Sequence, residues 1–123
     1  MTAAVPPTPA ASRQHDTATP LVHVSWPVFA DQLTHCLRAA GESRLADQVP
    51  TLRVLARCRC EDDFCQSFHT APPPVGRHGP GHRTICLIPR WDGYLLVDVI
   101  SGDRPSQPEQ IVFIEVLHRG PLN

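Results

Sequence analysis

The segments YLLVDVIS (94–101) and IVFIEVLHR (111–119) decide the fold class, because both are short, largely apolar and rich in β-branched residues. Their apolar residues alternate between two faces: Leu95, Val97, Val99, Val112, Ile114 and Val116 on one, and Tyr94, Leu96, Ile100, Phe113 and Leu117 on the other. We predict two antiparallel strands that are apolar on both faces. Helices can cover one face, so the second face needs another layer, an ordered loop or a second copy of the chain.

Further strand candidates precede this pair. RTICLIPR (83–90) reaches the first of the two strands through a tight turn at WDG (91–93). A period of two over residues 52–60 predicts another strand, and residues 65–70 can return as its partner after the four-residue turn EDDF. This alternation puts Leu52 and the cysteines on one face, which we expect to point toward the helices.

The N-terminal half has helical periodicity. One helix is expected to begin around Pro27, with Ser25 as its cap, and to end at Gly41; its apolar positions are Val28, Phe29, Leu33, Cys36, Leu37 and Ala40. A shorter helix is expected over residues 43–49, with Leu45, Ala46 and Val49 as its apolar side. The sequence thus predicts an α+β domain, with one or two N-terminal helices packed on a four- or five-stranded antiparallel meander sheet.

Composition sets the domain boundaries and the expected compartment. Residues 1–20 are rich in Pro, Ala and Thr and are predicted to be a disordered tail, which leaves residues 21–123 as a single domain. The net charge of −1 makes nucleic acid an unlikely partner, and no apolar run is long enough to predict a membrane span. The odd count of five cysteines fits a reducing compartment, so we expect a cytoplasmic protein.

The stretch RCRCEDDFCQSFH (57–69) concentrates cysteines in the predicted hairpin. Its register would place residues opposite one another in three pairs: Cys60 with Cys65, Cys58 with Ser67, and Ala56 with His69. Four side chains would then share a face and offer the thiolate and imidazole ligands that structural zinc sites use: Cys58, Cys60, Cys65 and His69.

Two other interpretations use the same geometry. Reduced cysteines can pack as small buried hydrophobes, which requires no cofactor, and the sequence favours this interpretation over zinc. A disulfide between Cys60 and Cys65 is the third alternative, although a reducing cytosol disfavours it. The spacing C-x-x-C of thiol oxidoreductases is absent.

Three weaker patterns complete the candidates. The loop RHGPGHR (77–83) could hold an anion, and a basic stripe with interleaved aromatics could stack bases: Arg53, Arg57 and Arg59 with Phe64 and Phe68. An acid/base pair can be imagined among Asp98, Glu115 and His118. For each of these patterns, a solvated or locally packed role is the more common one.

The stretch RCRCEDDFCQSF, together with the ending VDVISGDRPSQPEQIVFIEVL, resembles small bacterial proteins of unknown function. These carry a C-x-C-G-D-x-x-C-x-x-F stretch and a terminal hairpin that ends in I-E-V-L or I-E-I-L, and Glu61 stands here where their pattern has glycine. The resemblance implies a bacterial cytosolic protein and no particular activity.

The sequence therefore favours a non-enzymatic interaction domain, whose partner is another protein or a second copy that forms a homodimer through the second sheet face. A zinc-binding domain is the first alternative, and a small enzyme of unspecified reaction is the second.

Overall fold

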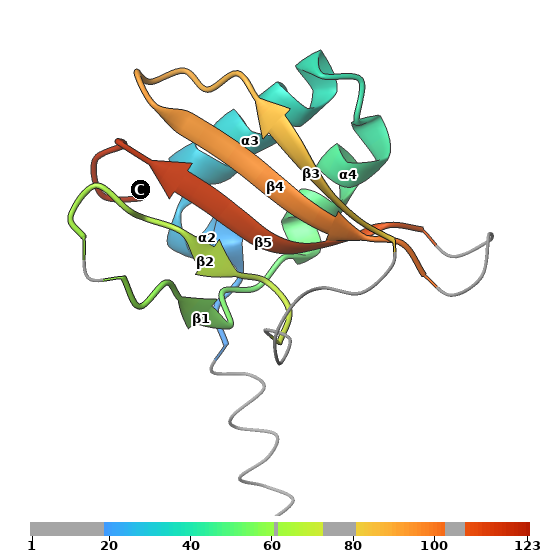
Figure 1. The fold of residues 1–123 in the computed structure, drawn as a ribbon, viewed down its shortest axis with the longest axis horizontal. Helices are drawn as coiled ribbons and strands as arrows, with labels where there is room; N and C mark the ends of the chain where they lie inside the picture. Colours follow the sequence, from blue (N-terminus) through green and yellow to red (C-terminus); the bar gives the residue numbers. More distant parts are fainter. Residues whose placement is uncertain (1–18, 61, 73–80, 103–107) are drawn as a thin grey trace, which may run out of the picture.

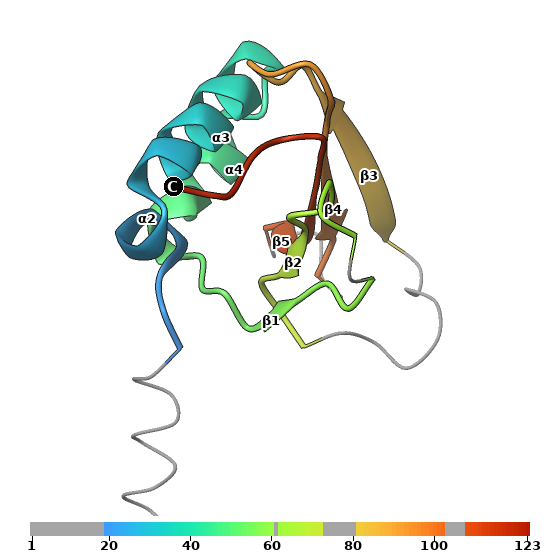
Figure 2. The same cartoon turned by 90° about the vertical axis from the view of Figure 1, so that its left-hand side faces the viewer.

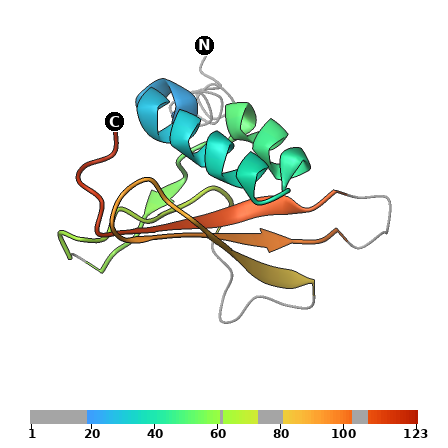
Figure 3. The same ribbon diagram turned by 90° about the horizontal axis from the view of Figure 1, so that it is seen from above.

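The computed structural model describes residues 19–60, 62–72, 81–102 and 108–123. Within these ranges, three α-helices lie on one face of a five-stranded antiparallel sheet, so the predicted α+β class is confirmed (Figures 1, 2 and 3). Of the predicted tail, residues 1–18 lie outside the described ranges, and the Pro20 carbonyl accepts a hydrogen bond from Val54 N–H at 2.9 Å. Within the described ranges, every helix is too short or too polar to cross a lipid bilayer.

The helices follow the predicted periodicity with changes at their ends. The helix α2 (Val22–Ser25) precedes α3 (Pro27–Ala39), and α4 (Ser43–Gln48) continues into the 3-10 turn η1 (Val49–Thr51). Ser25 is therefore not the expected cap of the main helix: it ends α2, and Trp26 occupies the cap position of α3 without a side-chain hydrogen bond. The buried face of α3 consists of Phe29, Ala30, Leu33, Cys36 and Leu37, whereas Val28 and Ala40 are exposed.

The sheet has the order β1-β2-β5-β4-β3. Its strands are β1 (Ala56–Arg57), β2 (Phe68–His69), β3 (His82–Leu87), β4 (Tyr94–Ile100) and β5 (Gln110–Leu117). The meander covers the last three strands, and the short first hairpin joins it at β5 and not beside β3 (Figure 1). This placement brings the cysteine-rich hairpin against the last strand of the chain.

The core lies between the helices and the sheet. Strand β4 contributes three buried residues at alternating positions, Leu95, Val97 and Val99, as the sequence predicts. In β5 the register shifts beside Val99, which pairs with Ile111. Ile111 therefore belongs to the core cluster, in the place expected for Val112. The bulge changes which side chain of β5 faces the helices at this point.

Candidate metal centre

The second limb of the cysteine-rich hairpin is fixed to β5 by its backbone. Gln66 N–H donates to the Val116 carbonyl at 2.8 Å, and His118 N–H donates to the Phe64 carbonyl at 2.7 Å. Cys65 forms an isolated bridge with Leu117 between these two contacts. The position of Cys65 is therefore set by a strand that belongs to the rigid centre of the sheet.

The first limb pairs with the second in the predicted register. Ala56 is the partner of His69, and Cys58 N–H donates to the Ser67 carbonyl at 2.9 Å. The assigned strands are much shorter than expected, at two residues each, and the turn is closed by Cys65 N–H donating to the Asp62 carbonyl at 3.1 Å.

The face of the hairpin that meets the helices is not the predicted one. Phe68 is fully buried, with its ring centroid 5.1 Å from that of Trp26, and its partner Arg57 lies over the same indole ring at 5.2 Å. Leu55 N–H also donates to the His69 carbonyl, so two residues of the first limb face one of the second, as in a β-bulge. The extra residue reverses the alternation that began at Leu52 and turns the cysteines away from the helices.

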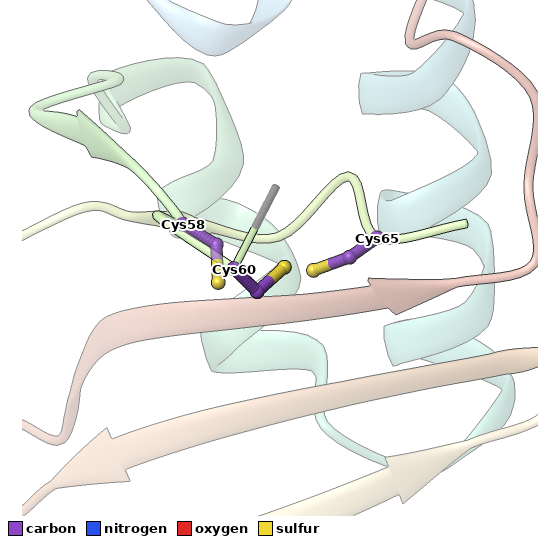
Figure 4. A group of neighbouring side chains, drawn as sticks. All are labelled: Cys58, Cys60 and Cys65. Atoms are coloured by element: carbon purple, nitrogen blue, oxygen red, sulfur yellow. The ribbon is translucent and has the colours of Figure 1, made fainter. Parts of the chain in front are cut away.

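Three thiols converge at the end of the hairpin. The Sγ atoms of Cys58, Cys60 and Cys65 all lie within 4.8 Å of one another. The side chains of Cys60 and Cys65 point toward each other across the turn (Figure 4). Cys58 and Cys65 are half-buried, but Cys60 is exposed, which contradicts the expectation that these cysteines pack as small buried hydrophobes.

We found no family model, curated protein or solved structure that matches the chain. The resemblance to small bacterial proteins therefore stays a prediction.

Hydrogen bonds differentiate the thiols. Cys60 has a hydrogen bond with the backbone of Asp62 that lowers its pKa, but its hydrogen bonds with Cys65 and Cys58 prevail and raise the pKa to about 11. Burial by itself would raise the pKa of Cys65, whereas hydrogen bonds with Ser67 and with the two other thiols bring it below the ordinary thiol value. Of the thiols of Cys60 and Cys65, that of Cys65 therefore loses its proton at the lower pH.

Ser67 supports the cluster, a role that the sequence analysis missed. Its Oγ lies 3.3 Å from Cys65 Sγ and accepts a hydrogen bond from Val116 N–H at 2.9 Å. The side chain is 2 % exposed, and a buried hydroxyl in such a position is held by its partners. The hydroxyl proton can donate to the Cys65 thiolate, which explains the direction of the pKa shift. A serine two residues from a cysteine is too common to have signalled this role.

His69 does not join the predicted ligand set. Among the described residues, the group of ligand atoms within 4.8 Å comprises the three thiols and no imidazole. The His69 ring packs instead against Phe113, with ring centroids 4.5 Å apart. His69 is paired with Ala56 as predicted, but this pair lies two residues along the hairpin from the pair of Cys58 and Ser67, too far for the imidazole to join the thiols.

The predicted anion site and base-stacking stripe take structural roles where they are described. Arg83 forms charged hydrogen bonds with Glu109 at 2.7 Å and with Glu42 at 3.0 Å, while residues 77–80 of that loop lie outside the described ranges. Phe68 belongs to the core, and Arg57 stacks on Trp26, so these two residues do not form the predicted stripe on the outer surface.

Asp98 and His118, two of the three candidates for the imagined acid/base pair, have separate local contacts. Asp98 accepts a hydrogen bond from Thr84 at 2.5 Å, and His82 Nε2 lies 3.4 Å from the same carboxylate. His118, at a positive φ of 61°, stacks on Phe64 with ring centroids 5.1 Å apart. These contacts do not direct the groups at a common reacting atom.

Proposed function

We propose that the protein is a metal-binding domain that holds one thiophilic ion, expected to be Zn²⁺, on Cys58, Cys60 and Cys65. The observation that carries the proposal is the mutual approach of the three Sγ atoms to within 4.8 Å. Core packing, which the sequence favours, does not account for an exposed Cys60 in this cluster, because an exposed thiol gains little from burial.

The sulfur geometry is close to that of a ligand set. Zn–S bonds of about 2.3 Å and tetrahedral angles put ligand sulfurs roughly 3.8 Å apart. The distances between the sulfurs therefore need to shorten by about 1 Å at most, which rotations of the cysteine side chains can supply, and Cys60 is exposed and free of tight packing. Three protein ligands leave the fourth position of a tetrahedral ion to water or to a further donor.

The support around the thiols favours the thiolate form of Cys65. Ser67 stabilises the charged form of Cys65, and the hydrogen bonds to β5 limit the motion of the limb that carries it. Thiolates are the form that binds soft and borderline metal ions, so the cost of deprotonation is already reduced at Cys65.

The test is zinc titration of the full-length protein, reduced and stripped of metal, in competition with a chromophoric chelator. We expect one equivalent of bound zinc, and a rise in melting temperature on the order of 10 °C at about a hundredfold excess over the dissociation constant. Replacement by serine of Cys58, Cys60 or Cys65 should each weaken binding at least tenfold.

Two control variants make this test specific. Cys86→Ser removes an exposed cysteine of β3 that is not part of the cluster, and His69→Ala removes the fourth ligand that the sequence suggested. Both variants should bind zinc like the unmodified protein. Equal zinc binding by the triple serine variant of the cluster would refute the proposal.

A second candidate is the non-enzymatic interaction domain expected from the sequence, which self-associates through the sheet face opposite the helices. On that face Tyr94 is 59 % exposed, and its ring lies 6.3 Å from that of His118, which stacks on the half-exposed ring of Phe64. Leu96, Ile100, Phe113 and Leu117 extend this apolar surface and are half-buried. Apolar surfaces of this kind commonly mark contacts with other chains.

Light scattering coupled to size-exclusion chromatography tests the second candidate. At micromolar concentration we expect a dimeric mass that Tyr94→Glu converts to a monomeric one. Ile88→Glu, at an 89 % exposed position between β3 and β4, is the matched control and should leave the mass unchanged. A monomeric mass of the unmodified chain would remove this candidate.

A further inference from the structure

The thiol cluster also contains a pair of sulfurs in position to form a disulfide. A backbone hydrogen bond pairs Cys58 with Ser67. The same hairpin register, continued two residues toward the turn, places Cys60 opposite Cys65. Residues opposed in this way can come within the distance that a disulfide spans. The two side chains point toward each other (Figure 4), with their sulfurs within 4.8 Å.

The other pairings in the cluster are less favourable. Cys58 and Cys60 are separated by one residue, so a disulfide between them would close a small, strained ring. Cys58 is opposite Ser67 and not opposite Cys65, so their pairing would cross the hairpin diagonally. Cys36 is on the buried face of α3, and Cys86 is on β3 at the other edge of the sheet. Geometry thus selects one pair.

We propose that Cys60 and Cys65 are an oxidative modification site, at which a hydroperoxide joins the two sulfurs as cystine and thereby displaces the bound metal. The displacement rests on the proposed function, whereas the disulfide itself rests on the geometry of the pair alone. Because Cys60 is exposed, the oxidant can approach the pair from the Cys60 side.

The reaction balances with one hydroperoxide as oxidant. The sulfur of one cysteine attacks the terminal peroxide oxygen and the O–O bond breaks. The departing oxygen leaves as an alcohol, or as water when the oxidant is hydrogen peroxide, after taking the thiol proton, or a proton from solvent where the sulfur is a metal-bound thiolate. The sulfenic acid that forms is then attacked by the second thiol: the S–S bond forms, the S–O bond breaks, and a water leaves. With hydrogen peroxide, two thiols and one peroxide give one disulfide and two waters.

The consequence for metal binding follows from the loss of ligands. A disulfide sulfur carries no negative charge and is a poor ligand for zinc, so oxidation removes two of the three thiolates at once. Cys58 alone cannot hold the ion. A reducing thiol that cleaves the disulfide restores all three ligands, so the modification is reversible.

The experiment treats the full-length protein, with and without bound zinc, with hydrogen peroxide and maps the product. Trypsin cleaves after Arg57 and Arg59, and endoproteinase Asp-N cleaves before Asp62, so the two enzymes separate all three cysteines of the cluster. We expect mass spectrometry to find the peptides of Cys60 and Cys65 joined. The thiol count under denaturing conditions should fall by two, and the loaded protein should release one equivalent of zinc.

The variants separate this inference from the proposed function. Cys58→Ser and Cys86→Ser should still form the disulfide, whereas Cys60→Ser should not. If the reduced protein binds no zinc but the Cys60–Cys65 disulfide forms, only the proposed function and the displacement fail. If zinc binds and peroxide yields another pairing, or oxidised sulfurs without a disulfide, the inference is overturned and the proposed function stands.

Discussion

Replacing Ser67 by alanine should destabilise the fold and weaken the acidity of Cys65 at the same time. The Ser67 hydroxyl accepts the hydrogen bond of Val116 N–H, and Val116 is fully buried. Its loss leaves a buried N–H without this partner, which costs about 1–3 kcal/mol. With a slope of about 2 kcal/mol per molar of urea, the unfolding midpoint should fall by roughly 1 M. The pKa of Cys65 should rise, because the hydroxyl no longer donates to the thiolate.

Urea unfolding followed by circular dichroism measures the first effect, and the alkylation rate of Cys65 as a function of pH measures the second. Thr51→Ala is the matched control, because its hydroxyl donates to the Gln48 carbonyl at an exposed position and should cost less than about 0.5 kcal/mol. An unchanged midpoint together with an unchanged Cys65 titration would refute the role assigned to Ser67.

Three further predictions concern the core, the surface and pH. Phe68→Ala should cost about 3–5 kcal/mol in urea unfolding, because the side chain is fully buried. Arg83→Ala should cost about 1 kcal/mol or less, and less still in high salt, because the side chain is 44 % exposed; Arg38→Ala, which breaks a more exposed ion pair, is the control. The raised pKa of Cys60 contributes stability that is complete below the ordinary thiol pKa and lost as the pH rises through about 11. Between about pH 8 and 11, the urea midpoint should therefore fall further for the unmodified protein than for Cys60→Ser.

The alternation of side chains with a period of two predicts β4 and β5 well, because each of these strands is paired with another strand on both sides. Strand β4 spans Tyr94–Ile100, within one residue of the predicted segment, and β5 spans Gln110–Leu117. Every second side chain of β4 meets the helices, so burial follows the sequence pattern. The exception is Ile111, which enters the core at a bulge that alternation alone does not reveal.

The candidate site was predicted in part. Residue spacing brought Cys58, Cys60 and Cys65 together, and the register of Ala56 with His69 was correct. The orientation was wrong, because one extra residue at Leu55 reverses the face of a two-period pattern. The bulge depends on the contacts of the hairpin with Trp26 and with β5. These contacts join residues that are far apart in the sequence, so no local sequence pattern indicates them.

The hydrogen bond from Val116 to Ser67 joins residues 49 positions apart and has a consequence for biosynthesis. At about 5–20 residues per second, a ribosome needs roughly 2–10 seconds to add that length of chain. During this interval the cysteines have left the peptidyl-transferase centre, but the strand that orders Cys65 does not yet exist. The proposed metal site therefore has no preformed pocket during this interval, and any selectivity for one ion would begin only when translation has supplied β5.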